Sequence, residues 1–167
     1  SFEELYSAFR KQLAFVIDQK IRVSNYIDRM FAKYAPAPFL SVVIEDCIST
    51  GKDYYNGGPR YNTSYIQCTG LGTITDSLTT LKKHIFEGKT FTMEKMLDAI
   101  AKNFEGDEFM RQTIMNRTPF FGNDDDYADD IAQRIYRDLF DLIDGQPNIK
   151  GGQYHLNMLS TTCHVYF

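Results

Sequence analysis

The sequence predicts a helix-rich α/β fold with too few strands to close a sheet of its own. Apolar residues recur at helical spacing through several long segments. Only two segments, residues 65–68 and 154–167, have the pattern of strands. Glycine and proline separate these segments, as in turns and loops. The length is enough to bury a normal apolar core, and we expect residues 1–167 to belong to one domain.

The first expected element is a long amphipathic helix from residue 5 to about residue 34. Pro36 and Pro38 follow it, and a helix usually ends before such residues. Pro38 also suits the first turn of a second helix, residues 39–50, which Gly51 ends. The sequence therefore predicts two helices before the first loop.

Residues 53–75 differ from these helices. They contain four glycines, one proline and four tyrosines, a composition that indicates an ordered loop. A short extended stretch, Tyr65 to Cys68, lies inside it. We expect Thr75 and Asp76 to cap the next helix, which runs to about Phe86.

The second half is predicted to contain three more helices and a closing strand. The helices are residues 92–104, capped by Thr92, residues 108–116, and about 127–143. Acidic residues before the last of these stabilise its positive end by roughly 0.3–1 kcal/mol each. The strand, residues 154–167, is expected to be interrupted near Ser160.

The composition excludes several classes of protein. The net charge is -4, so no basic surface for nucleic acid or anionic lipid is expected. No segment approaches the roughly 20 apolar residues of a membrane span, and the first residues do not resemble a signal peptide. Three widely separated cysteines argue against a disulfide framework and for a reducing compartment. We expect a cytoplasmic protein.

Several residues resemble catalytic or metal sites but have simpler interpretations. Cys163 and His164 are neighbours in a strand, so their side chains point to opposite faces, and the cysteine is expected to be a small core residue. The histidines lack metal-ligand spacing. His84 is expected to cap a helix or to interact favourably with the helix dipole near its C-terminus. The acidic cluster at 124–130 does not match a calcium loop, and a solvated helix start explains it.

The segment Gly57–Asn62 leaves two interpretations open. Two glycines and a proline bend the backbone and present Arg60, Tyr61 and Asn62. These side chains either belong to a functional site or hold the loop, with Arg60 and Asn62 bonded to backbone carbonyls. The residues alone favour neither interpretation.

The two ends of the chain suggest an interior segment of a longer protein. Ser1 and Glu4 have capping-box spacing at the start of a helix. The other end, Phe167, falls inside an apolar strand, whereas domains usually end in frayed polar residues.

Four blocks of the sequence resemble, in order, those of the glycyl radical enzymes, the pyruvate formate-lyase-like family. The first block is Pro38-Phe39-Leu40-Ser41, and the second is Gly57-Gly58-Pro59-Arg60-Tyr61-Asn62 with Gln67, Gly70, Gly72 and Asp76-Ser77-Leu78. The third and fourth are residues 122–129 and 160–167. The resemblance implies that this chain is a helix-rich, incomplete part of the family's α/β barrel.

Within the family, residues 62–67 and 159–164 resemble the trans-4-hydroxy-L-proline dehydratases. Ser160 departs from the proline expected there. The resemblance implies a parent lyase that dehydrates trans-4-hydroxy-L-proline by thiyl-radical hydrogen abstraction, with this chain inactive alone. The alternatives are a glycerol or propanediol dehydratase, a formate acetyltransferase-like member, or a non-catalytic fragment or interaction piece.

The resemblance also implies where the chemistry lies. Family members are anaerobic enzymes that keep a radical on a glycine, installed by a radical S-adenosylmethionine activase, and pass it to a cysteine. The G-C-x-E and R-V-[AS]-G-[YF] motifs of these residues do not occur in this sequence. We expect them before Ser1 and after Phe167, so this chain is expected to bind no cofactor and no metal. The expected partners are a small-molecule substrate, the activase, the remaining polypeptide and a second copy in a homodimer.

The resemblance assigns two kinds of site residue. Leu159 and Thr161 are expected to contact the substrate, since a hydroxyl at Thr161 could bond a carboxylate or ammonium group. Arg60, Tyr61, Asn62 and Gln67 are expected to support the loop near the reacting centre without touching substrate.

Overall fold

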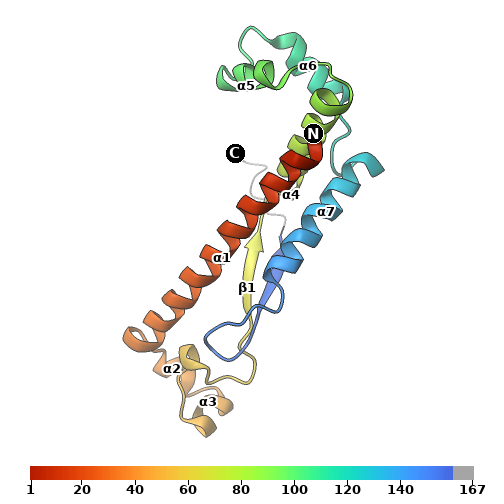
Figure 1. The fold of residues 1–167 in the computed structure, drawn as a ribbon. Helices are drawn as coiled ribbons and strands as arrows, with labels where there is room; N and C mark the ends of the chain where they lie inside the picture. The colour runs from red at the N-terminus through yellow and green to blue at the C-terminus, as the bar shows by residue number, and fades with distance from the viewer. Residues whose placement is uncertain (160–167) are drawn as a thin grey trace. The chain divides into compact units, whose positions relative to one another are not determined.

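The computed structural model describes residues 1–159. Helices dominate this part of the chain, which also contains two short strands (Figure 1). In chain order the elements are α1 (Phe2–Tyr34), α2 (Pro38–Ser41), α3 (Glu45–Thr50), the 3₁₀ helix η1 (Tyr54–Asn56), β1 (Ser64–Cys68), α4 (Leu71–Leu81), the π-helix η2 (Lys82–Glu87), α5 (Met93–Ala101), α6 (Glu108–Arg117), α7 (Asp126–Ile143) and β2 (Tyr154–Met158). The helix-rich α/β prediction is confirmed.

The chain divides into two compact units. The first consists of residues 1–8 and 70–138, and the second of residues 9–69 and those from 139 on. The boundaries fall within α1, between β1 and α4, and within α7.

The first unit has a small helical core. Buried Phe91, Met96, Ala99 and Met110 form it, and partly buried apolar side chains of α4, η2 and α6 pack around them. Tyr6 at the start of α1 is 1% exposed and donates a 2.8 Å hydrogen bond to Asp138 of α7. Apolar burial and this bond therefore join elements that are distant in sequence.

The second unit contains a two-stranded parallel sheet. Residues Ser64–Cys68 of β1 align with Tyr154–Met158 of β2. Ile66 and Tyr154 on one face are 5% and 2% exposed. The Tyr154 hydroxyl donates to Asn25 of α1 at 3.1 Å, so α1 covers that face. Both predicted strand segments are confirmed as far as Met158, and the rest of the closing segment lies outside the described residues.

The predicted helix 39–50 is wrong as a single helix. It divides into α2 and α3, and Ile44 between them is extended, with φ -110° and ψ 114°. Val42, Val43 and Ile44 are consecutive β-branched residues, which lose side-chain freedom in a helix. The break therefore falls at a run of residues that lose side-chain freedom in a helix.

The predicted start of the next helix is also wrong. α4 begins at Leu71 after Gly70, and Thr75 is buried inside it. Asp76 does not cap this helix, because its carboxylate accepts a 2.8 Å hydrogen bond from the backbone N–H of Phe121. The Asp76 carboxylate, which the local pattern assigned to a helix cap, therefore binds a residue that is distant in sequence.

The helix capped by Thr92 is shorter than predicted. The cap is confirmed, since the Thr92 hydroxyl accepts from the Lys95 N–H at 3.2 Å. α5 nevertheless ends at Ala101, and Phe104 has a φ of 61°. Phe104 therefore packs on the core from a turn instead of from the helix.

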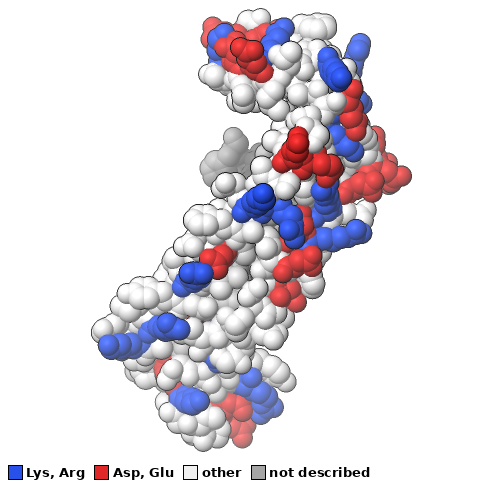
Figure 2. All heavy atoms as spheres, in the orientation of Figure 1, with Lys and Arg blue, Asp and Glu red and all other residues white. Residues whose placement is uncertain are grey.

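Charges are mixed on the visible surface. Figure 2 shows acidic and basic side chains interspersed, with no continuous basic area on the face drawn. Among the helices of the described residues, none combines the length and apolar character needed to cross a membrane. Residues 1–159 also contain no cluster of three or more His, Cys, Asp or Glu that could hold a metal ion.

Candidate functional site

The open face of the strand pair brings predicted site residues together. Side chains alternate along a strand, so Gln67 of β1 shares a face with Asn157 opposite it and with Leu159. The N–H of Leu159 donates to the Cys68 carbonyl at 3.4 Å, which extends the ladder beyond β2. Leu159 is 45% exposed. Thr161 lies outside the described residues.

An imidazole–carboxylate pair occupies the same face. His155 Nδ1 lies 2.9 Å from Asp144 Oδ1, just after α7. The ring of Tyr65, opposite His155 in the register, lies 5.9 Å away between centroids. Sequence reasoning missed this pair because the contact depends on how the chain turns back between α7 and β2, where the Gly145 N–H donates to the Tyr154 carbonyl. The available signal was the alternation that places His155 and Leu159 on one face.

The Gly57–Asn62 loop packs too closely for side chains at its first positions. Gly57 has a φ of 75°, and a Cβ there would lie 2.7 Å from the Lys150 carbonyl oxygen. A Cβ on Gly58 would meet the Lys52 carbonyl oxygen and approach Cys47 Sγ to 2.6 Å. The two glycines therefore allow the loop to lie against both neighbouring segments.

Asn148 joins this loop to the segment before β2. It is 8% exposed, and its Nδ2 donates to the Asn62 carbonyl at 2.5 Å and to Ser64 Oγ at 3.0 Å. Its Oδ1 accepts from the N–H groups of Lys150 at 3.0 Å and Gly152 at 2.9 Å. Sequence reasoning missed Asn148, whose position after Pro147 gave no more than a turn signal. The four hydrogen bonds of its side chain fix the segments that precede β1 and β2 relative to each other.

The three polar residues of the loop have different surroundings. Asn62 Nδ2 donates to the Pro59 carbonyl at 2.5 Å. Arg60 pairs with the Asp46 carboxylate of α3 at 3.0 Å, and not with a carbonyl as the simpler interpretation expected. Tyr61 is 82% exposed. Asn62 thus holds the loop itself, and Arg60 ties it to α3.

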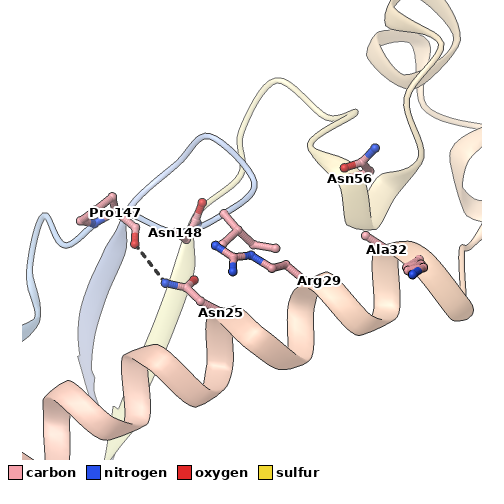
Figure 3. Close-up of a pocket in the computed structure, with 8 residues that line it drawn as sticks. Asn25, Arg29, Ala32, Asn56, Pro147 and Asn148 are labelled. Atoms are coloured by element: carbon pink, nitrogen blue, oxygen red, sulfur yellow. Dashed lines mark hydrogen bonds between the residues drawn. The ribbon is translucent and has the colours of Figure 1, made fainter.

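Asn148 also lines a cavity of about 680 Å³, most of whose other lining residues are polar (Figure 3). Arg29 and Lys33 of α1 line one side, and Asn56 and the segment around Pro147 line the other. Asn25 closes part of it, with Nδ2 donating to the Pro147 carbonyl at 3.4 Å. The cavity separates α1 from the loops that enter the sheet.

His84 lies in the last turn of η2, and its side chain bonds a residue of another segment. It is 3% exposed, and its Nε2 lies 3.0 Å from the Thr118 hydroxyl oxygen. Burial, followed by the charges of Lys83 and Arg117, lowers the pKa of His84. The imidazole is therefore held in its neutral form over a wider pH range than in water.

The two described cysteines are not activated nucleophiles. Burial, with smaller effects from Asp53 and Asp46, raises the pKa of Cys47. Burial also raises the pKa of Cys68. The thiolate is the nucleophilic form, so neither sulfur is poised for polar attack at neutral pH. Cys163 and His164 lie outside the described residues, and so does the core position predicted for Cys163.

The chain is similar to known proteins along its whole length. Residues 1–167 match the family described as "Pyruvate formate lyase-like". The sequence is 50% identical over 100% of this chain to the "Trans-4-hydroxy-L-proline dehydratase" of Clostridioides difficile, of which it covers 21%. It is 32% identical to the "(2S)-3-sulfopropanediol dehydratase" of Klebsiella oxytoca, over 99% of this chain and 20% of that protein.

Solved structures give the same result. The crystal structure of the Clostridioides difficile hydroxyproline dehydratase with bound substrate has a TM-score of 0.92 and 49% identity, over 99% of this chain and 21% of that one. The glycerol-bound B12-independent glycerol dehydratase of Clostridium butyricum has a TM-score of 0.85 and 31% identity, over 93% and 20%. The chain thus spans about a fifth of the length of these relatives.

Proposed function

The chain belongs to the pyruvate formate lyase-like family, and on this premise we propose that it is a segment of a glycyl radical lyase that dehydrates trans-4-hydroxy-L-proline. The observation that carries the proposal is 50% identity to such a dehydratase over the whole chain. Identity to the glycerol dehydratase is 31%, so a diol substrate is the weaker candidate. In the parent enzyme an activase would install the glycyl radical outside this segment.

Exposed apolar side chains support the role of a segment. Several large ones on α1, α2 and the turn after it face solvent, among them Phe15 at 63%, Tyr34 at 65%, Phe39 at 90% and Val43 at 75%. Large apolar side chains that are exposed in this number indicate a surface that another surface covers. We propose that the rest of the parent polypeptide covers these apolar side chains. For the whole protein we also propose a homodimer and a cytoplasmic location.

The open sheet face is the proposed wall of the substrate pocket. Leu159 would make an apolar contact that excludes water, and the Thr161 hydroxyl would bond the substrate carboxylate or ammonium. Gln67, on the same face as Leu159, would keep the strand pair in place beside them. This wall matters because a thiyl or substrate radical must be kept from water and oxygen.

The loops before the strands would keep this wall rigid. Asn62 closes its own loop on Pro59, and Asn148 bonds the Asn62 carbonyl. Arg60 anchors the same loop to Asp46. We propose no direct substrate contact for Arg60, Tyr61 or Asn62. Catalytic groups would come from the polypeptide outside this segment.

Anaerobic assay of the activated full-length protein tests the substrate. We expect turnover of trans-4-hydroxy-L-proline and little turnover of glycerol or propane-1,2-diol. Turnover of a diol without turnover of hydroxyproline would overturn the proposal. The intact mass of the native protein tests the rival interpretation, because a 19.3 kDa native species would favour a non-catalytic interaction piece.

A further inference from the structure

A second cavity lies within the first unit. Its volume is about 480 Å³, and it opens between η2, the turn after it and the end of α6. Six residues line it: Lys83, His84, Gly88, Thr90, Thr113 and Arg117. None of these residues belongs to the wall proposed for the substrate pocket.

The π-helix η2 shapes one side of this cavity. The Gly88 N–H donates to the Lys83 carbonyl at 2.8 Å, and the Thr90 N–H donates to the His84 carbonyl at 2.8 Å. A Cβ on Gly88 would lie 2.7 Å from the Lys83 carbonyl oxygen, so the turn needs glycine there. Short π-helical turns are rare and occur frequently at functional sites.

The cavity gathers positive charge that the described residues do not neutralise. Lys83 comes from η2 and Arg117 from α6, and no carboxylate is among the lining residues. Within residues 1–159 neither cation forms an ion pair, whereas the neighbouring Lys82 pairs with Glu87 at 3.8 Å. Both cations also act on His84, whose pKa they lower after the larger effect of burial.

Structural roles explain only part of this arrangement. Arg117 lies in the last turn of α6, where a cation is favourable to the helix dipole. That role does not explain why Lys83 lines the same cavity. The Thr113 hydroxyl is satisfied, since it donates to the Phe109 carbonyl at 2.7 Å. Thr90, which also carries a hydroxyl, lines the cavity as well.

We propose that this cavity binds a small oxyanion, a carboxylate or phosphate group, between Lys83 and Arg117, with the Thr90 hydroxyl as a hydrogen-bond donor. Two cations from separate elements suit the several acceptor oxygens of such a group. The oxyanion is either a free ion or a carboxylate of the polypeptide outside this chain. The chemistry at Lys83 and Arg117 is the same in both cases.

The test uses the full-length protein, unactivated and dialysed into a low-salt buffer without oxyanions. Calorimetric titration with inorganic phosphate and with acetate measures free-ion binding, and the melting temperature is followed with each ion. The variants are Lys83→Gln and Arg117→Gln. The matched control is Lys95→Gln, which removes an exposed cation of α5 that does not line the cavity. None of these readouts depends on catalysis.

Two results support the proposal and identify the source. If the ion is free, phosphate or acetate binds the native protein and the control, and each cavity variant binds on the order of tenfold more weakly. If the parent supplies a carboxylate, added ions bind no form, and the cavity variants melt several degrees below the control. The proposal is overturned if the cavity variants bind ions and melt as the control does.

Discussion

Replacing Asn148 by alanine should loosen the entries to both strands. The side chain is 8% exposed and makes four hydrogen bonds, two as donor and two as acceptor. Each contributes about 1 kcal/mol net. Water can reach some of the freed backbone groups once the loop opens, so we expect a local loss of about 2–3 kcal/mol instead of the full sum.

Hydrogen exchange with mass spectrometry on the full-length protein measures this loss locally. Amides of residues 57–64 and 147–153 should exchange about 30- to 150-fold faster in Asn148→Ala, since about 1.4 kcal/mol corresponds to tenfold. Asn123→Ala is the control, because that exposed side chain makes a single 3.2 Å bond to the Phe120 carbonyl. Exchange at 57–64 that rises no more in Asn148→Ala than in the control would refute the assignment of Asn148 as the link between the loops.

Three further predictions concern separate features. Gly58→Ala should destabilise the second unit by about 1–3 kcal/mol, because its Cβ would approach Cys47 Sγ to 2.6 Å; unchanged exchange at residues 45–60 would contradict this. Glu3→Gln should cost less than about 1 kcal/mol despite the 2.7 Å pair with Arg134, because that pair is exposed, so a melting temperature lowered by many degrees would count against it. The lowered pKa of His84 means that the unfolded chain takes up a proton first, so stability is lost as pH falls below about 6.5. His84→Gln should reduce the fall in melting temperature between pH 7.5 and 5.5, and an undiminished fall would exclude His84 as its source.

The elements predicted correctly are those whose signals are local. Gly51 ends α3 with a φ of 64°, and Thr92 caps α5, as their positions in the sequence indicate. Asp76 was predicted wrongly because its carboxylate serves the N–H of Phe121, a residue distant in sequence. Asn148 was missed for the same reason, since its partners belong to two loops that meet only in the folded chain. The local sequence pattern does not determine which of several possible hydrogen-bond partners a polar side chain binds.

The candidate site was predictable residue by residue but not as a surface. Resemblance to known blocks singled out Gln67 and Leu159 separately. That they lie on one face depends on the parallel register in which Gln67 aligns with Asn157. The same register brings Tyr65 beside His155, a contact that no spacing in the sequence indicates.

The incomplete side of the sheet and the proposed pocket wall are the same surface. Parallel sheets occur almost only with both faces covered, because their strands depend on burial on both sides. Here α1 covers one face through Tyr154, which is 2% exposed, while Tyr65 and Leu159 on the other face are 63% and 45% exposed. A barrel that closed over this second face would bury these side chains and enclose a cavity against them. The further polypeptide that we propose would, in completing the sheet, therefore lie where the substrate pocket is proposed.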